Sequence, residues 1–106
     1  MVCSECVVIY CTAPPGEAAS IGKALVTEKL AACANIVEVR SIFAWQNEIC
    51  EEQEHLLIIK TQSALLDRIT ERIRELHTYD LPEIIALPIV AGYAPYLDWV
   101  QEETAG

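Results

Sequence analysis

The sequence predicts a single α+β domain in which strands and helices follow the order β-α-β-β-α-β, with a short helix at the C-terminal end. Three observations predict this fold class. The length of 106 residues suits one domain. Two stretches repeat apolar residues with helical spacing. Between them, two runs of strand-favouring residues flank a plausible turn at residues 46–48, which indicates a long β-hairpin.

The first strand and the first helix are separated by a clear break. Residues 6–11 form a short apolar run that fits a buried strand, and the prolines and glycine of residues 12–16 end it. We expect the first helix over residues 15–32, because apolar residues recur there with helical spacing. Glu17 in its first turn and Lys29 in its last turn would both suit the helix dipole.

The hairpin, residues 35–61, is long for a domain of this size. Its first arm, residues 36–46, would extend about 36 Å at roughly 3.3 Å per residue, whereas a domain of this length is only about 30–35 Å across. An overhanging strand exposes backbone groups that must be protected or paired. We therefore expect the overhang to pair with another copy of the chain. We interpret the acidic residues near the tip as a solvated end: Glu48, Glu51, Glu52 and Glu54.

Three further elements complete the pattern. A second helix is expected over residues 63–77, with Ser63 as its N-cap. Its buried stripe would consist of Leu65, Leu66, Ile69, Ile73 and Leu76. The fourth strand is expected over residues 83–90, at a sheet edge, because Pro88 cannot donate a ladder hydrogen bond. Residues 96–103 are expected to form the short C-terminal helix.

This order of elements is the ferredoxin-like βαββαβ sandwich, an antiparallel sheet with both helices on one face. Its usual strand order places the second and fourth strands at the edges, as the long hairpin arm and Pro88 require. The first and fourth strands are apolar on both faces, so the uncovered face would be more apolar than is normal for a monomer. A homo-oligomer with cyclic symmetry would cover it.

Composition and charge exclude several function classes. The net charge is −9, and the seven basic residues form no cluster, which argues against nucleic acid and anionic membranes as partners. No apolar run approaches the ~20 residues of a membrane-spanning helix. The five cysteines are scattered, unlike a disulfide framework. No signal peptide is visible in the sequence, so we expect a cytoplasmic protein.

Several motifs resemble those of the CutA1 family of divalent-cation tolerance proteins. The resemblance rests on residues 11–14 (CTAP), 29–36 (KLAACANI), Trp45, Glu54, 57–61 (LIIKT) and 77–84 (HTYDLPEI). It covers almost the whole chain in the right order and spacing. The chain departs from the family at Thr78, where proline is usual. It also has no cysteine near Arg72, where some bacterial members carry one, so a copper site that needs that cysteine is not supported.

The resemblance implies both an architecture and a function. It implies a fold related to the PII signalling proteins, a homotrimer whose long hairpins pair across subunits, and binding of copper or another divalent cation. It also implies that the protein is not an enzyme. The residues agree, because the chain has no recognisable set of nucleophile, base and orienting group and no glycine loop that would bind phosphate.

Three residues are candidate metal ligands. Cys33, between a helix and a strand, fits either a small buried residue or a soft ligand for Cu(I). Cys11 ends the first strand without a CxxC partner, so a neighbouring subunit would have to complete its site. His77, at a helix end, suits either an interaction with free carbonyls or a metal. We interpret the CxxC sequence formed by Cys3 and Cys6 as a chance occurrence.

The resemblance also groups Trp45, Lys60, Tyr79 and Glu83 with His77 in one cleft between subunits. Such a cleft would bind a metal or a small anion. Two functions follow from these sites. The first is a trimeric protein of the metal response that binds copper or a similar cation. The alternative is a PII-like signalling or scaffold module that binds a small molecule or a protein partner in the cleft.

Overall fold

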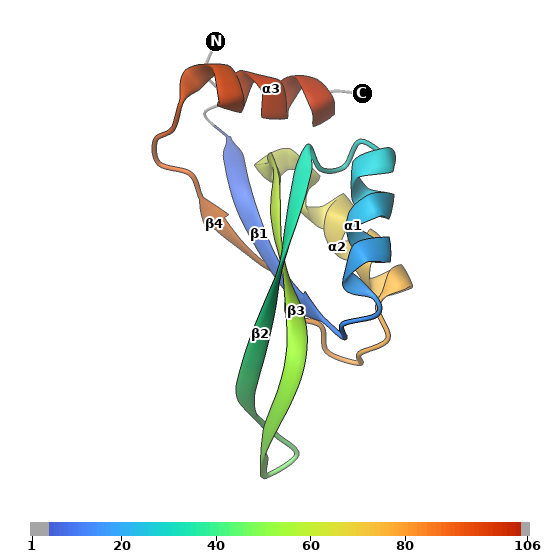
Figure 1. Ribbon diagram of the computed structural model, residues 1–106. Helices are drawn as coiled ribbons and strands as arrows, with labels where there is room; N and C mark the ends of the chain where they lie inside the picture. Colours follow the sequence, from blue (N-terminus) through green and yellow to red (C-terminus); the bar gives the residue numbers. More distant parts are fainter. Residues whose placement is uncertain (1–4, 105–106) are drawn as a thin grey trace.

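The computed structural model describes residues 5–104, so Cys3 of the CxxC sequence lies outside the described residues. The predicted order of elements is confirmed (Figure 1). The elements are β1 (Cys6–Ala13), α1 (Ala18–Thr27), β2 (Cys33–Trp45), β3 (Glu48–Gln62), a 3-10 turn (Ser63–Leu65), α2 (Leu66–Leu76), β4 (Ile85–Pro88) and α3 (Ala94–Thr104).

The four strands form one antiparallel sheet in the order β2-β3-β1-β4. The second and fourth strands therefore lie at the edges, as predicted, and Pro88 lies opposite Val7 on the edge strand β4. Helices α1 and α2 cover one face of the sheet, and α3 lies across the end where β1 begins (Figure 1). This is the ferredoxin-like arrangement.

The core lies between the sheet and the two helices α1 and α2. Alternate residues of β1 and β3 point toward the helices, because side chains alternate between the faces of a strand. Ile9 and Leu57 are fully buried there, against Leu25 of α1 and against Ile69 and Ile73 of α2. The predicted stripe of α2 is thus its buried face. A smaller cluster under α3 contains Leu97 and Val100, and both side chains are buried.

The hairpin projects beyond the rest of the domain, which confirms the predicted overhang (Figure 1). The molecule measures 48 × 25 × 21 Å, with the hairpin along its long axis. The turn is tighter than expected, because Trp45 already pairs with Glu48. Gln46 and Asn47 alone connect the strands, with φ of 50° and 65°. Two successive left-handed residues match the twist of a hairpin.

Helix α1 is shorter than the predicted helix at both ends. Glu17 is its N-cap residue and not part of its first turn. At the other end, Lys29 adopts a left-handed φ of 61° and stops the helix. The N–H of Lys29 bonds to the carbonyl of Val26, and that of Leu30 to the carbonyl of Leu25. This is a Schellman motif, and the expected run to residue 32 was wrong for that reason.

The start of α2 and the length of β4 also differ from the prediction. Ser63 does not cap α2, because the chain first makes a 3-10 turn and α2 begins at Leu66. The fourth strand spans only Ile85–Pro88 rather than residues 83–90. Within residues 5–104, no helix is long and apolar enough to cross a membrane.

The sheet face opposite α1 and α2 remains partly uncovered and apolar. Val37, Ile85 and Leu87 lie on that face and are 44%, 50% and 38% exposed. Helix α3 covers only one end of it (Figure 1). The single chain thus has the bare face that the sequence predicts, while the oligomer that would cover it stays a prediction.

Candidate functional site

His77 follows the last residue of α2, and both of its ring nitrogens are occupied. Nε2 lies 2.7 Å from the carbonyl oxygen of Thr12, and Nδ1 accepts a hydrogen bond from the backbone N–H of Tyr79 at 3.1 Å. A carbonyl only accepts and a backbone N–H only donates, so the proton is on Nε2 and the ring is neutral. His77 therefore has no free lone pair for a metal in this arrangement.

Cys11 lies on β1, within the core. Burial raises the pKa of its thiol to about 12, and the negative charges of Glu83 and Glu54 add to the increase. Its Sγ lies 3.7 Å from the carbonyl oxygen of Thr12. Metal binding requires the thiolate, so Cys11 is poorly suited as a ligand at neutral pH.

The segment after His77 is fastened to two other elements. Thr78 donates hydrogen bonds from its backbone N–H and from its hydroxyl to the carboxylate of Glu17, at 3.2 and 2.7 Å. The hydroxyl of Tyr79 donates to Glu54 of β3 at 2.9 Å. Glu54 is only 5% exposed. The expectation that all acidic residues near the tip are solvated is therefore wrong for Glu54.

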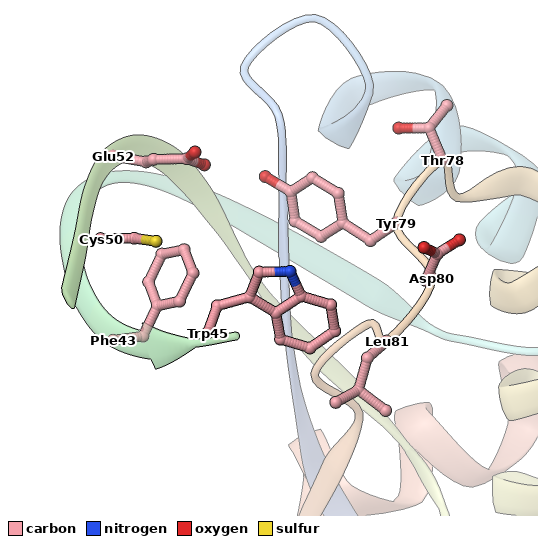
Figure 2. Close-up of a pocket in the computed structure, with 8 residues that line it drawn as sticks. All are labelled: Phe43, Trp45, Cys50, Glu52, Thr78, Tyr79, Asp80 and Leu81. Carbon is pink, nitrogen blue, oxygen red and sulfur yellow. The ribbon is translucent and has the colours of Figure 1, made fainter. Parts of the chain in front are cut away.

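The same segment forms one wall of a pocket of about 330 Å³ (Figure 2). The opposite wall is the outer part of the hairpin, which contributes Trp45 and Phe43 from β2 and Cys50 and Glu52 from β3. Residues 78–81 complete the lining. Trp45 thus faces its own chain as well as solvent, since it is 39% exposed.

Cys33 and Lys60 lie elsewhere, near the end of the sheet covered by α3. They are direct cross-strand partners. The Nζ of Lys60 donates to Oδ1 of Asn35, and the Sγ of Cys33 lies 3.9 Å from the same oxygen. The phenol of Tyr96, on α3, has a raised pKa because of burial and the neighbouring Cys33. Unlike Cys11, Cys33 is half-buried.

The predicted site residues therefore fall into two groups within one chain. Cys11, His77, Tyr79 and Glu83 surround the far end of β1, close to the pocket that contains Trp45. Cys33 and Lys60 are at the other end, since Lys60 is six residues from Glu54 along β3, roughly 20 Å. A cleft that contains both groups requires a second copy. Among residues 5–104, no three His, Cys, Asp or Glu residues are placed to hold a metal together.

Sequence reasoning missed several pocket residues. Phe43 shares a face with Trp45 on the hairpin arm, and that alternation was the one available signal. Cys50 and Glu52 gave no signal, because nothing local distinguishes a pocket-lining side chain on the hairpin from those around it.

The sequence and the structure are both similar to those of known proteins. The family described as CutA1 divalent ion tolerance protein matches residues 7–103. Divalent-cation tolerance protein CutA of Thermus thermophilus is 50% identical over 99 residues, which cover 92% of this chain and 96% of that protein. The chain spans only 56% of Protein CutA 1, chloroplastic, of Oryza sativa, to which it is 44% identical.

Solved structures give the same result. Cut A1 of Thermus thermophilus matches with a TM-score of 0.91 at 48% identity, over 93% of this chain and 98% of that one. The CutA protein of Archaeoglobus fulgidus, described as periplasmic, has a TM-score of 0.91 at 38% identity, with coverage of 93% and 98%. A protein of Nostoc described as PII-like CutA has a TM-score of 0.88 at 35% identity, over 92% and 96%. This chain belongs to the CutA1 divalent ion tolerance protein family.

Proposed function

We propose that this protein acts in tolerance of divalent cations as a homotrimer, and that it binds a copper ion or a similar cation at a site completed by a neighbouring copy. The position of Cys33 supports this most. Its thiol is half-buried on the partly uncovered face of the sheet, at the start of the edge strand β2 that another copy would meet. Thiolates favour Cu(I) over harder cations.

The other two candidate ligands do not fit a metal as they stand. His77 uses both ring nitrogens in hydrogen bonds, and the pKa of Cys11 is raised to about 12. Cys33 is one donor, and a metal site needs several. Cyclic symmetry repeats each thiol once per copy, so an assembly would supply the missing donors.

Calorimetric titration with Cu(I), Cu(II) and Zn²⁺ tests this proposal on the reduced protein. We expect Cys33→Ser to weaken Cu(I) binding at least tenfold, and Cys11→Ser and His77→Ala to leave it close to wild type. Cys50→Ser, which removes another half-buried thiol, is the matched control. Absent binding, or equal binding by all four variants and the wild type, would show that Cys33 is not a ligand.

A second candidate function is a PII-like signalling or scaffold role, in which cation tolerance is indirect. The pocket between the hairpin and residues 78–81 favours it, because its volume of about 330 Å³ lies within the range of small-molecule sites. A thermal-shift screen with nucleotides, small anions and small organic cations tests it, together with a pull-down for protein partners. If no compound raises the melting temperature and no partner is recovered, this role has no support.

The proposal includes no enzymatic step, and it places the protein in the cytoplasm. The odd number and scattered spacing of the five cysteines support that compartment. Fractionation of cells that express the full-length protein would check the assignment, and recovery outside the cytoplasm would contradict it.

A further inference from the structure

Cys6, the first residue of β1, is held in a disulfide bond. Of the five cysteines in the chain, Cys11, Cys33 and Cys50 are free thiols. The sequence therefore leaves Cys3, which lies outside the described residues, as the partner of Cys6. The two belong to one CxxC sequence, a spacing that dithiol–disulfide pairs of redox proteins use. Chance occurrence of two cysteines at this spacing does not explain the bond.

The surroundings of Cys6 come from its own chain. Its side chain is 2% exposed and packs with Ala32, Leu97 and Val100 in the cluster under α3. Its Sγ lies 3.8 Å from the carbonyl oxygen of Leu97. Helix α3 lies across this end of the sheet (Figure 1). A second copy of the chain is therefore not needed to form the bond or to bury this sulfur.

The start of β1 is fixed by backbone hydrogen bonds that do not involve the disulfide. The N–H of Ser63 donates to the carbonyl of Glu5 at 2.7 Å, and the N–H of Ile89 donates to the carbonyl of Cys6 at 3.3 Å. A disulfide between residues three apart closes a short loop, so it restricts the unfolded chain little. The bond can therefore break while β1 remains in the sheet.

The reduced form of Cys6 also fits its surroundings. A thiol behaves as a small apolar group with a weak S–H donor. The cluster under α3 offers it apolar side chains and the carbonyl oxygen of Leu97 as an acceptor. Both redox states are thus compatible with packing under α3. In the cytoplasm, where we place the protein, most thiols are kept reduced, and the disulfides that form are usually transient or redox-sensing.

We propose that Cys3 and Cys6 form a redox-active pair that exchanges between disulfide and dithiol with small thiols of the glutathione class. Because α3 covers Cys6, the thiolate of one small thiol attacks the sulfur of Cys3. The S–S bond breaks, and the sulfur of Cys6 leaves and takes up the proton that the small thiol lost. A second small thiol attacks the mixed disulfide, which returns Cys3 as a thiol. The protein gains two electrons and two protons, and the two small thiols leave as one disulfide.

Alkylation and mass spectrometry test this proposal on the wild-type protein, equilibrated without oxygen at varied ratios of reduced to oxidised glutathione. After an acid quench, the unfolded protein is alkylated and digested. Trypsin releases residues 1–23, which contain Cys3, Cys6 and Cys11. This peptide should carry three labels in the reduced state and one in the oxidised state. We expect the fraction in each state to follow the glutathione ratio, and fragmentation to place the bond between Cys3 and Cys6.

Two variants test the pairing. Cys3→Ser removes one sulfur and should form no disulfide within residues 1–23 at any glutathione ratio. Cys50→Ser removes a half-buried free thiol outside this peptide, so it is the matched control. It should change state at the same glutathione ratio as the wild type. A bond that persists within the peptide of Cys3→Ser would contradict the pairing of Cys3 with Cys6.

The wild-type titration alone decides the proposal if a variant does not fold. A bond that persists in a large excess of reduced glutathione would identify a structural disulfide. Three labels at every ratio would show that no bond forms, and glutathione attached to Cys3 or Cys6 without a bond between them would show that they do not act as a pair. Each of these results would overturn the redox-active pair. None of them would affect cation binding at Cys33, because the proposal goes beyond that function and does not rest on it.

Discussion

The three free cysteines within residues 5–104, Cys11, Cys33 and Cys50, differ in reactivity because each has a different environment. Cys11 is fully buried between the sheet and the helices, with Glu83 and Glu54 near enough to oppose its ionisation. Cys33 and Cys50 are free thiols that solvent partly reaches. Residue type alone made Cys11 and Cys33 equal candidates as metal ligands, whereas burial separates them.

The raised pKa of Cys11 predicts a loss of stability at alkaline pH. The unfolded chain loses the thiol proton near the ordinary value of 9.0, and the folded chain keeps it up to about 12. Because the folded state then binds more protons, the stabilisation is complete below pH 9 and is lost as pH rises toward 12. The free energy of unfolding should fall by at most about 1.4 kcal/mol per pH unit from this group.

Urea unfolding at pH 8 and pH 10.5 measures this effect at one fixed protein concentration. Cys11→Ala should lower stability at both values but reduce the difference between them, whereas Cys50→Ala should keep the wild-type difference. An unchanged difference in Cys11→Ala would mean that another group causes the alkaline loss.

The bond between Tyr79 and Glu54 yields a second prediction. Tyr79→Phe removes the hydroxyl that donates to a carboxylate only 5% exposed. A buried acceptor that loses its partner costs about 1–3 kcal/mol, so the free energy of unfolding at pH 7 should fall by that amount. Tyr93→Phe, at a side chain 76% exposed, is the control. Equal stability of the two variants would mean that water replaces the bond.

Only part of this chemistry was accessible from the sequence. The motifs placed His77 and Tyr79 correctly at the end of α2, because chain order fixes neighbours within a loop. They did not indicate that Thr12 would occupy Nε2 of His77, or that Glu54 would be buried under Tyr79. Those contacts join residues far apart in the chain, and local patterns carry no information about them.

At the scale of elements, the end of α1 explains why a periodic pattern can outlast a helix. Leu30 follows the helical spacing of Ile21 and Leu25, yet it lies beyond Lys29, where the helix has ended. In a Schellman motif the residue after the left-handed position packs back on the last turn. Leu30 and Leu25 are both buried in the core. The apolar spacing therefore predicted correctly that Leu30 is buried, although the backbone is no longer helical at that residue.

Lys29 is an unfavourable residue for its conformation, which gives an element-scale prediction. A side chain at left-handed φ costs roughly 1–2 kcal/mol, which glycine avoids, although glycine also makes the unfolded chain more flexible. We expect Lys29→Gly to raise the free energy of unfolding by about 0.5–1 kcal/mol. Lys23→Gly, inside α1, should lower it by about 1 kcal/mol. Destabilisation of similar size in both variants would contradict the left-handed end of α1.

At the scale of the whole molecule, the sequence predicted the architecture well because few strand orders are compatible with the predicted strands and helices. The β-α-β-β-α-β order, the apolar faces of the two helices and the edge position that Pro88 requires leave few strand orders other than the ferredoxin-like one. Lys60 and His77 are separated within one chain, so the cleft between subunits that the resemblance implies for them stays a prediction. The motifs that carry them are neighbours in the family pattern, but they lie at opposite ends of the sheet.

The bare sheet face leads to a prediction about assembly. Ile85 is half exposed in the single chain, so Ile85→Lys should disturb the folded monomer little, while a charge on that face should prevent copies from packing. Light scattering should give the wild type a mass about three times the chain mass of 11.8 kDa, and the variant a lower mass. Val26→Lys, on the exposed side of α1, should remain trimeric. A wild type of 11.8 kDa would contradict the trimer.

The central position of β1 has a consequence for synthesis on the ribosome. This apolar strand is made first, yet its neighbours are β3, which pairs Thr61 with Val7, and β4, which pairs Pro88 with the same residue. A strand whose partners are distant in the chain pairs late, whereas β2 and β3 can close on their two-residue turn within microseconds. In pulse-labelled refolding, hairpin amides should gain protection before those of β1. The nascent chain must therefore carry β1 without a partner until β3 has emerged, and one edge of β1 stays unpaired until β4 follows.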